Sequence, residues 1–419
     1  MERNSSNSPE SRRKIAFLSI FGITQLHYRN PYVVAWWSAA FPGLGHMLLS
    51  KYIRGFLLFI WEVVINLKAH LNMGIFYTFT GNFKAAQEVL DIRWLLLYNA
   101  VYIFSIWDSY RAANDVNNSY ELAAREDAEI QPFIMNSLEL NYLDRKIPWV
   151  SAMWSFLMPG TGQLYNHRIV AATFMFVWWI VILYYSKVLP AIHFTFTGGF
   201  EMARSVVDEH WAMNISSVYM FSVYDAYMNT VENNKLFEWE QSQFLKKHYQ
   251  NSNFTVPGKN ITAGGDQMYI ISTFEHSIFL EKAVTAIQMR GIAKEDILAV
   301  PLDKRAEQRK LFDSIHQSDG LSLMDLASIL GTIFMLLGTI YGFLLKFGPV
   351  FWGMAGLIAG FSLGLAIKLL ILRKSSRRQD NKKVSEVVLI IDCVKDKAEM
   401  VADTLWNHHA LGVSRLDLN

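Results

Sequence analysis

The chain has 419 residues, of which 52% are hydrophobic and only 18% are charged, whereas soluble domains carry roughly 25% charged residues. Its 39 Lys and Arg residues nearly balance its 37 Asp and Glu residues, which excludes a broad nucleic-acid-binding surface, and the hydrophobicity excludes global disorder. The single cysteine, Cys393, excludes an intrachain disulfide framework and a cysteine-rich zinc or iron–sulfur site. The composition therefore predicts a multi-pass α-helical membrane protein.

The first 30 residues are expected to form a polar tail with a short interfacial segment. Three basic residues at 12–14 precede an apolar run from Ile15 to Ile23. This run has the length of a signal-peptide core, but polar and basic residues follow it where small residues would mark a cleavage site. We therefore expect an uncleaved tail in the cytosol.

An internal duplication is the strongest feature of the sequence. Residues 31–110 align without a gap to residues 148–227, at a constant offset of 117 and with roughly two dozen identities. A match of this length predicts two copies of one structural unit. The repeated motifs are Pro-Gly-x-Gly, at 42–45 and 159–162, and Thr-Phe-Thr-Gly-x-Phe, at 78–83 and 195–200.

Each copy is predicted to contain one short helix and two long ones. The short apolar helix, at 33–41 or 150–158, ends at the Pro-Gly motif. A helix of this length rises only about 15 Å, half of a bilayer core, so we expect a re-entrant or interfacial segment. The long helices are expected at 53–67 and 94–110 in the first copy, and at 169–188 and 211–227 in the second.

The orientation of the two copies depends on whether the short helices cross the membrane. If they do not cross, both copies face the same way; if they cross, the copies are inverted, as in many transporters. Lys and Arg are concentrated before, between and after the copies rather than in the Thr-Phe-Thr-Gly loops. This bias favours parallel copies in a cytoplasmic membrane, with both chain ends in the cytosol.

The C-terminal third is expected to form a split soluble domain. Two strand–helix–strand patterns, within 267–303 and 386–418, flank two apolar segments in 326–372. Together they suit a ferredoxin-like α+β domain interrupted by a transmembrane hairpin, which brings the expected spanning helices to six. The expected domains are the tail 1–30, repeat 31–110, cytosolic linker 111–147, repeat 148–227, polar linker 228–266, half-domain 267–303, linker 304–325, hairpin 326–372 and half-domain 386–418.

Glycines recur every fourth residue in the hairpin. Such spacing lets helix backbones approach closely in lipid, so we expect the hairpin to pack on itself or on a second copy of the chain in a homo-oligomer. The basic cluster Arg373–Arg378 follows and is suited to anionic lipid at the cytosolic surface. The packing glycines are Gly338, Gly342, Gly356, Gly360 and Gly364.

Two resemblances follow from these motifs. The Trp-Ser-x-x-x-Pro-Gly-x-Gly-His/Gln segments at 37–46 and 154–163 resemble those of small bacterial two-transmembrane domains with a Pro-Gly-x-Gly-Gln turn. Residues 267–418 resemble bacterial stress-induced membrane proteins, in which a split α+β domain encloses a glycine-zipper hairpin. Both resemblances imply a bacterial cytoplasmic-membrane protein, and neither implies catalytic residues.

Five polar residues in the membrane repeats are candidate site residues. Glu62 lies in the middle of a long apolar helix, where an ionisable side chain is costly and often functional; the alternative is a structural pair with Asn66. Asp108 and Asp225 occupy equivalent helix ends, and we expect them to hold the Pro-Gly turns by accepting backbone N–H bonds; the alternative is ion coordination. His46 and Gln163 follow those turns and are expected to line the same feature.

The sequence predicts no enzyme, because it contains no nucleophile motif, phosphate-binding loop or metalloprotease motif. Catalytic residues, a metal site and a cofactor are therefore not expected. The leading hypothesis is a sensor or scaffold whose cytosolic domain binds a protein partner or small ligand and reports to the membrane. The alternative is a transporter or channel with Glu62 in the pathway, and a lipid-modifying enzyme ranks last.

Overall fold

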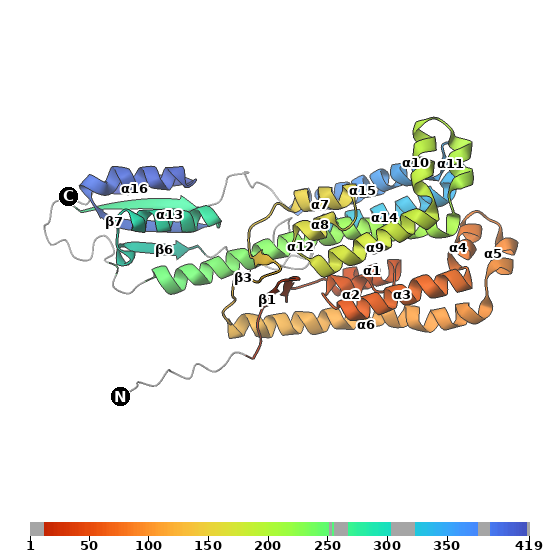
Figure 1. Ribbon diagram of the computed structural model, residues 1–419, viewed down its shortest axis with the longest axis horizontal. Coiled ribbons are helices and arrows are strands. Elements are labelled where there is room, and N and C mark those ends of the chain that lie inside the picture. The colour runs from red at the N-terminus through yellow and green to blue at the C-terminus, as the bar shows by residue number, and fades with distance from the viewer. Residues whose placement is uncertain (1–11, 251–253, 255–266, 303–322, 376–385, 417–419) are drawn as a thin grey trace. The chain divides into compact units, whose positions relative to one another are not determined.

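The structure is a computed structural model that describes residues 12–250, 254, 267–302, 323–375 and 386–416 (Figure 1). These residues divide into two compact units. The first contains the described parts of 1–141, 147–232 and 309–377, and the second those of 142–146, 233–308 and 378–419. The polar linker around Pro257, the linker 304–322 and the end of the basic cluster, at 376–378, lie outside the described residues.

The N-terminal segment forms a hairpin of two antiparallel strands, β1 (Ala16–Ser19) and β2 (Gly22–Gln25). Gly22 at the turn has a φ of +147°, which only glycine adopts easily. The apolar run expected at the interface is therefore a small β-hairpin. A second short pair, β3 (Phe133–Met135) and β4 (Leu140–Tyr142), lies between the two sets of helices along the chain.

Two sets of six helices follow the same order along the chain, and each helix of the second set begins 117 residues after its counterpart. The first set is α1 (Pro31–Ala40), α2 (Leu44–Leu48), α3 (Tyr52–Ala69), α4 (Leu71–Phe79), α5 (Phe83–Val89) and α6 (Ile92–Glu126). The second set is α7 (Pro148–Leu157), α8 (Thr161–Tyr165), α9 (Ile169–Ser186), α10 (Val188–Phe196), α11 (Phe200–Val206) and α12 (Glu209–Tyr249).

The first long helix of each set is followed by a further short helix that the sequence does not predict. In the first set a turn was expected after the long helix, and in the second set the long helix was expected to continue to residue 188. His70 and Lys187 adopt left-handed backbone, with φ of +53° and +55°, and a new short helix begins after each of them. The bend between α3 and α4 is 65°. The expected helix 169–188 is therefore two helices, because the left-handed residue interrupts the i to i+4 hydrogen bonds.

Helix α12 is the central helix of the first unit. Every side chain from Ala212 to Asn233 is buried or half-buried, including Ser222 and Asp225. A helix surrounded by protein does not need an apolar surface toward lipid, so its sequence tolerates these polar residues. Its apolar segment was expected at 211–227, but the helix continues to Tyr249.

Three helices among the described residues are long and apolar enough to cross a membrane, or up to five if each bent pair counts as one span. The three are α9, α14 (Leu323–Gly342) and α15 (Gly348–Ser375). The bent pairs are α3 with α4 and α5 with α6. Helix α12, which contains the sixth expected span, is not among these candidates.

Helices α14 and α15 pack closely where the glycines lie. A Cβ added at Gly356 or Gly360 would collide with the carbonyl oxygen of Phe334 or Leu330 across the interface. One added at Gly364 would come within 2.5 Å of the Ala327 Cα. Gly338 and Gly342 face the opposite helix in the same way. The two backbones therefore approach as closely as the missing side chains allow.

The second unit contains a four-stranded antiparallel sheet in the order β6-β7-β5-β8. Residues at alternate strand positions pack with α13 and α16 in one apolar core, which includes Ile297, Leu389 and Ile391. Strands β5 and β7 pair at the centre of the sheet, although β7 follows β5 by more than a hundred residues along the chain. The elements are β5 (Gln267–Phe274), α13 (Ile278–Met289), β6 (Ile297–Pro301), β7 (Val387–Val394), α16 (Lys395–Asn407) and β8 (Gly412–Leu416).

Candidate functional site

The Pro-Gly turns place two similar polar clusters in the first unit. Gly43 and Gly160 have φ of +97° and +104°, so each turn requires a residue without a Cβ. A Cβ at Gly43 would also collide with the Gly55 carbonyl oxygen of α3. The turn therefore docks directly on the next helix, and the one-turn helix after it carries His46 or Gln163 into the interior.

In the first set, Asp108 is the centre of the cluster. Its carboxylate lies 3.0 Å from His46 Nε2 and 2.8 Å from Arg54 Nη1, and its second oxygen lies 2.8 Å from Arg111 Nη2. His46 and Asp108 are buried, but about half of each arginine side chain is exposed. The cluster therefore joins a buried acceptor to two arginines that reach the surface.

In the second set, Asp225 has different partners in the same place. It lies 3.1 Å from Gln163 Nε2 and 2.5 Å from Arg168 Nη1, and its other oxygen accepts from Asn229 Nδ2 at 2.8 Å. Both members of the ion pair are almost completely buried. Arg168 also donates to the Tyr52 hydroxyl of α3 at 2.9 Å, so this cluster joins the two helix sets.

Side chains, rather than the expected backbone N–H groups, supply the donors to both aspartates among the described contacts. The turn amide of Gly160 instead donates to the Ser222 hydroxyl at 3.2 Å. No pattern in the sequence indicated that the arginines are partners of the two aspartates. In the alignment of the two copies, Arg168 corresponds to Lys51 and Arg54 corresponds to Ala171. The two arginines therefore do not occupy equivalent positions, and the repeat gave no signal for them.

Three buried polar atoms of the first helix set, at positions that align with Gln163 and its serine partners, have no hydrogen-bond partner among the described residues. They are His46 Nδ1 and the hydroxyl oxygens of Ser38 and Ser105. At the equivalent place in the second set, Gln163 Oε1 accepts from both serine hydroxyls, at 3.1 and 3.3 Å. An amide therefore satisfies this position, whereas the imidazole leaves the serines unpaired.

Glu62 is almost completely buried and belongs to a chain of amides. Its Oε1 accepts from Asn66 Nδ2 at 3.0 Å, and the same nitrogen lies 3.0 Å from Asn72 Oδ1. Asn72 then donates to Asn214 Oδ1 of α12 at 3.1 Å and to the His210 carbonyl oxygen at 2.8 Å. The Tyr98 side chain also interacts with the Glu62 carboxylate. The contact between Glu62 and Asn66 that the structural alternative predicts is thus present, and it belongs to a longer hydrogen-bond network.

The equivalent positions of the second set line an apolar cavity of about 290 Å³. Trp179, Leu183 and Leu189 stand where the first set has Glu62, Asn66 and Asn72. The two sets share one tyrosine contact at this place: Tyr102 donates to the Ala39 carbonyl oxygen and Tyr219 to that of Phe156, at 2.8 and 2.5 Å. One location in the fold is therefore polar in the first set and apolar in the second.

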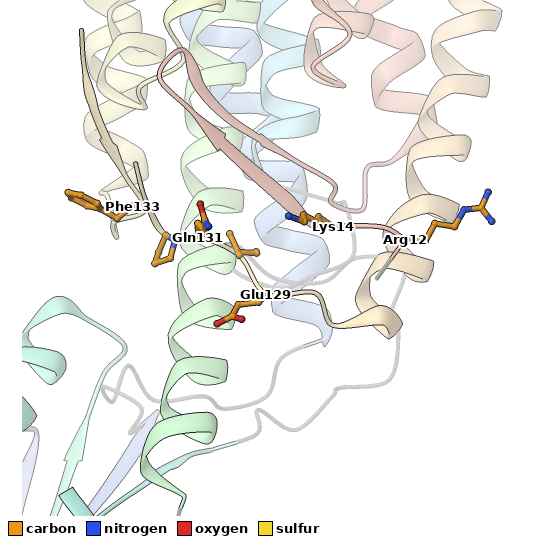
Figure 2. A pocket seen from close by; sticks show the side chains of 7 residues that line it. Arg12, Lys14, Glu129, Gln131 and Phe133 are labelled. Carbon is orange, nitrogen blue, oxygen red and sulfur yellow. The ribbon is translucent and has the colours of Figure 1, made fainter. Parts of the chain in front are cut away.

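A second hollow is lined by the N-terminal segment and the residues that follow α6. Figure 2 shows that its labelled side chains do not converge: Arg12 points away from Lys14, and Glu129 and Phe133 point in different directions. No shared ligand geometry results. Within the described ranges, no group of three or more His, Cys, Asp or Glu side chains is placed to hold a metal ion.

Neither the protein-family models, the curated proteins nor the solved structures contain a match to this chain. The resemblances of the Pro-Gly motifs and of the split domain therefore stay predictions.

Proposed function

We propose that the chain is a non-enzymatic integral membrane protein, a sensor or scaffold that couples a cytosolic ferredoxin-like domain to a duplicated membrane platform. The common order and spacing of the two helix sets support the duplication. The strand order β6-β7-β5-β8, with one helix after β5 and one after β7, supports the ferredoxin-like assignment. The close approach at five hairpin glycines supports the glycine zipper.

The observation that carries the proposal is the continuity of α12. Residues 209–232 of this helix belong to the first unit and residues 233–249 to the second. Val218 and Tyr224 pack in the core of the first unit, and Leu245 and Tyr249 pack in the core of the second. We infer that a displacement of either core acts on this shared helix, and this is the coupling that the proposal requires and that the experiment below measures.

Hydrogen bonds attach α12 to the first half of the split domain, and His276 links that half to the second. Gln241 Oε1 lies 2.9 Å from His276 Nδ1, and Gln241 Nε2 donates to Glu281 at 2.6 Å. The His276 amide in turn donates to Glu386 at 2.9 Å, at the start of the second half. Arg145, from the linker between the helix sets, donates to the His276 carbonyl oxygen at 3.0 Å. His276 is thus a node where the linker, α12 and both half-domains meet.

The sheet supplies a surface for a partner. Leu298 and Val300 of β6 and Val388 and Ile390 of β7 alternate with the core residues and are half-buried. Side chains at alternate strand positions point to opposite faces, so these four lie on the face opposite α13 and α16. An apolar face of this kind suits a protein or an apolar ligand.

Coupling can be tested by hydrogen exchange on the full chain in lipid nanodiscs. Ile391→Val, which removes one buried methyl group from the second core, costs about 0.5–1.5 kcal/mol. We expect faster amide exchange in the first half of α12 as well as in the sheet. Lys235→Pro interrupts α12 near the unit boundary, and we expect it to abolish the remote effect, whereas Lys235→Ala preserves it.

Two results would contradict the proposal. One is exchange in residues 209–232 that does not respond to Ile391→Val or to the larger change Ile391→Ala. The other is a remote effect that persists unchanged in the Lys235→Pro background, because communication would then not pass through α12.

A transporter or channel is the second candidate function, and the buried amide chain from Glu62 to Asn214 favours it. A buried carboxylate within a helical membrane segment suits a proton or cation. Reconstituted protein should then carry solute or ion flux that Glu62→Gln abolishes. Glu88→Gln, at an exposed position of α5, is the matched control. Absence of flux across a broad panel of ions and solutes would reject this function.

A further inference from the structure

The cavity of about 290 Å³ lies between the second helix set and the α14–α15 hairpin. Both elements belong to the first unit. The wall thus combines a part of the duplicated platform with the segment that separates the two half-domains along the chain. Characteristic wall residues are Leu183, Leu189 and Ile192 from the helix set, and Met335, Val350 and Met354 from the hairpin.

The chemistry of the wall selects an apolar occupant. None of its lining residues is Asp, Glu, Lys, Arg or His. Its two hydroxyl groups are already used, because Tyr219 donates to the Phe156 carbonyl oxygen and Thr339 to that of Met335. Apolar cavities of this kind stay dry rather than hold ordered water. The volume lies just below the usual range of about 300–1,000 Å³ for small-molecule pockets, which suits one hydrocarbon chain.

The position of the cavity identifies the source of such a chain. Helices α9, α14 and α15 are the three that qualify individually as membrane spans, and all three contribute to the wall. In a bilayer, the medium around these helices is lipid hydrocarbon. We propose that the cavity binds one acyl chain of a bilayer phospholipid. The inference rests on the proposed membrane function and names the ligand class that this part of the platform detects.

The duplication supplies an internal comparison. The first helix set has Glu62, Asn66 and Asn72 where the cavity wall has Trp179, Leu183 and Leu189. Burying an apolar chain against amides and a carboxyl group is unfavourable, so only the second set binds the chain. An acyl chain between α9–α10 and the hairpin would alter the packing of the hairpin. A change in the lipid composition of the bilayer would therefore change the packing of the membrane platform.

Photo-cross-linking in nanodiscs tests this assignment. The probe is phosphatidylcholine with a diazirine on one acyl chain, and the cross-linked peptides of the full chain are identified by mass spectrometry. We expect preferred labelling of α9, α10 and α15 peptides that contain wall residues. Ile192→Trp should fill the cavity and abolish this labelling. Ile75→Trp, at the equivalent half-buried position of the first set, should leave it unchanged.

Ile192→Ala keeps the test decisive if the larger side chain disturbs folding, because a smaller wall residue preserves the cavity and should preserve the labelling. Uniform labelling of both helix sets, or labelling that survives Ile192→Trp in folded protein, would overturn the proposal. Labelling by a free diazirine fatty acid but not by the phospholipid would overturn it as well. Hydrogen exchange after Ile391→Val measures the coupling between the two units without any lipid probe. Failure of the lipid site and failure of the proposed function are therefore distinguishable.

Discussion

At the scale of single residues, one aspartate position is neutralised in two ways. Asp108 has two arginine partners that are half exposed, and Asp225 has one that is buried. Exposed ion pairs contribute little because water screens them. Breaking a buried pair leaves an uncompensated charge and costs much more. The arginines of the two clusters therefore contribute differently to the stability of the protein.

Arg168→Ala should lower the free energy of unfolding by about 3–5 kcal/mol. Arg54→Ala, which leaves Asp108 with Arg111 and His46, should lower it by less than about 1 kcal/mol. Thermal unfolding of the purified protein in detergent measures both. Equal losses in the two variants would show that burial does not distinguish the clusters.

His46→Gln should stabilise the protein by about 1–3 kcal/mol, because the amide can accept from Ser38 and Ser105, which are unpaired in the structure. The reciprocal change Gln163→His should be destabilising, since it leaves Ser155 and Ser222 without the Gln163 acceptor. The same thermal unfolding assay applies. Stabilisation by both changes, or by neither, would contradict the role assigned to the amide.

At the scale of elements, the α14–α15 hairpin shows how close packing depends on particular glycines. Gly356 faces the backbone of Phe334, which cannot move aside. At Gly331 an added Cβ would lie 3.3 Å from the terminal methyl group of Met220, a flexible side chain that can adjust, and at ordinary contact distance, 3.6 Å, from the Phe361 side chain. The two glycines lie in the same helix pair but tolerate substitution differently.

Gly356→Ala should cost about 1–3 kcal/mol through forced separation of the two helices. Gly331→Ala should change the stability by no more than about 0.5 kcal/mol. Distances between spin labels on α14 and α15 should increase only in Gly356→Ala. Equal distances in both variants would remove the basis for calling these glycines packing residues.

The carboxylate of Asp392, in strand β7, lowers the stability of the second unit at neutral pH. Burial and the neighbouring Asp296 raise the pKa of Asp392, although a hydrogen bond from Tyr269 opposes them. The folded state therefore binds this proton more tightly than the unfolded state, and stability falls as pH rises from the ordinary value of 3.8 through the raised pKa.

Asp392→Asn should accordingly be more stable than the natural protein at pH 7, and the difference should disappear below the ordinary carboxyl pKa. Cys393, the only cysteine, is buried beside it. Its reaction with a pyridyl disulfide in increasing denaturant reports unfolding of this unit across that pH range. A stability difference that grows as the pH falls would have the wrong sign.

At the scale of the whole molecule, one sheet constrains the path of the chain. Strand β5 precedes the hairpin and pairs along its full length with β7, which follows it. The chain on both sides of the hairpin therefore lies on the same side of any membrane that the hairpin enters. Two crossings by α14 and α15 satisfy this requirement, because both helices are long enough to span.

Cysteine labelling tests this topology in a Cys393→Ser background. Met289→Cys and Trp406→Cys, at exposed positions in the two half-domains, should react with an impermeant maleimide from the same side of sealed vesicles. Lys346→Cys, between the hairpin helices, should react from the opposite side. Labelling of the two half-domain positions from opposite sides would contradict the paired sheet and the membrane hairpin together.

Local patterns in the sequence were sufficient to place most elements. The strand–helix–strand patterns expected within 267–303 and 386–418 are present, and the short helices end at the Pro-Gly motifs as expected. Turn chemistry and hydrophobic period act over a few residues, so a single sequence contains this information. The breaks after His70 and Lys187 were missed, because neither residue type demands left-handed backbone.

The sequence alone was therefore sufficient to predict apolar helices long enough to cross a membrane, and the strand–helix–strand patterns on both sides of the hairpin that form one antiparallel sheet. Only the tertiary structure decided that Arg168 pairs with Asp225, that Glu62 connects through amides to Asn214, and that α12 is central to the first unit and continues into the second. Those contacts join residues far apart along the chain. Their partners depend on how whole helices pack, which no local pattern encodes.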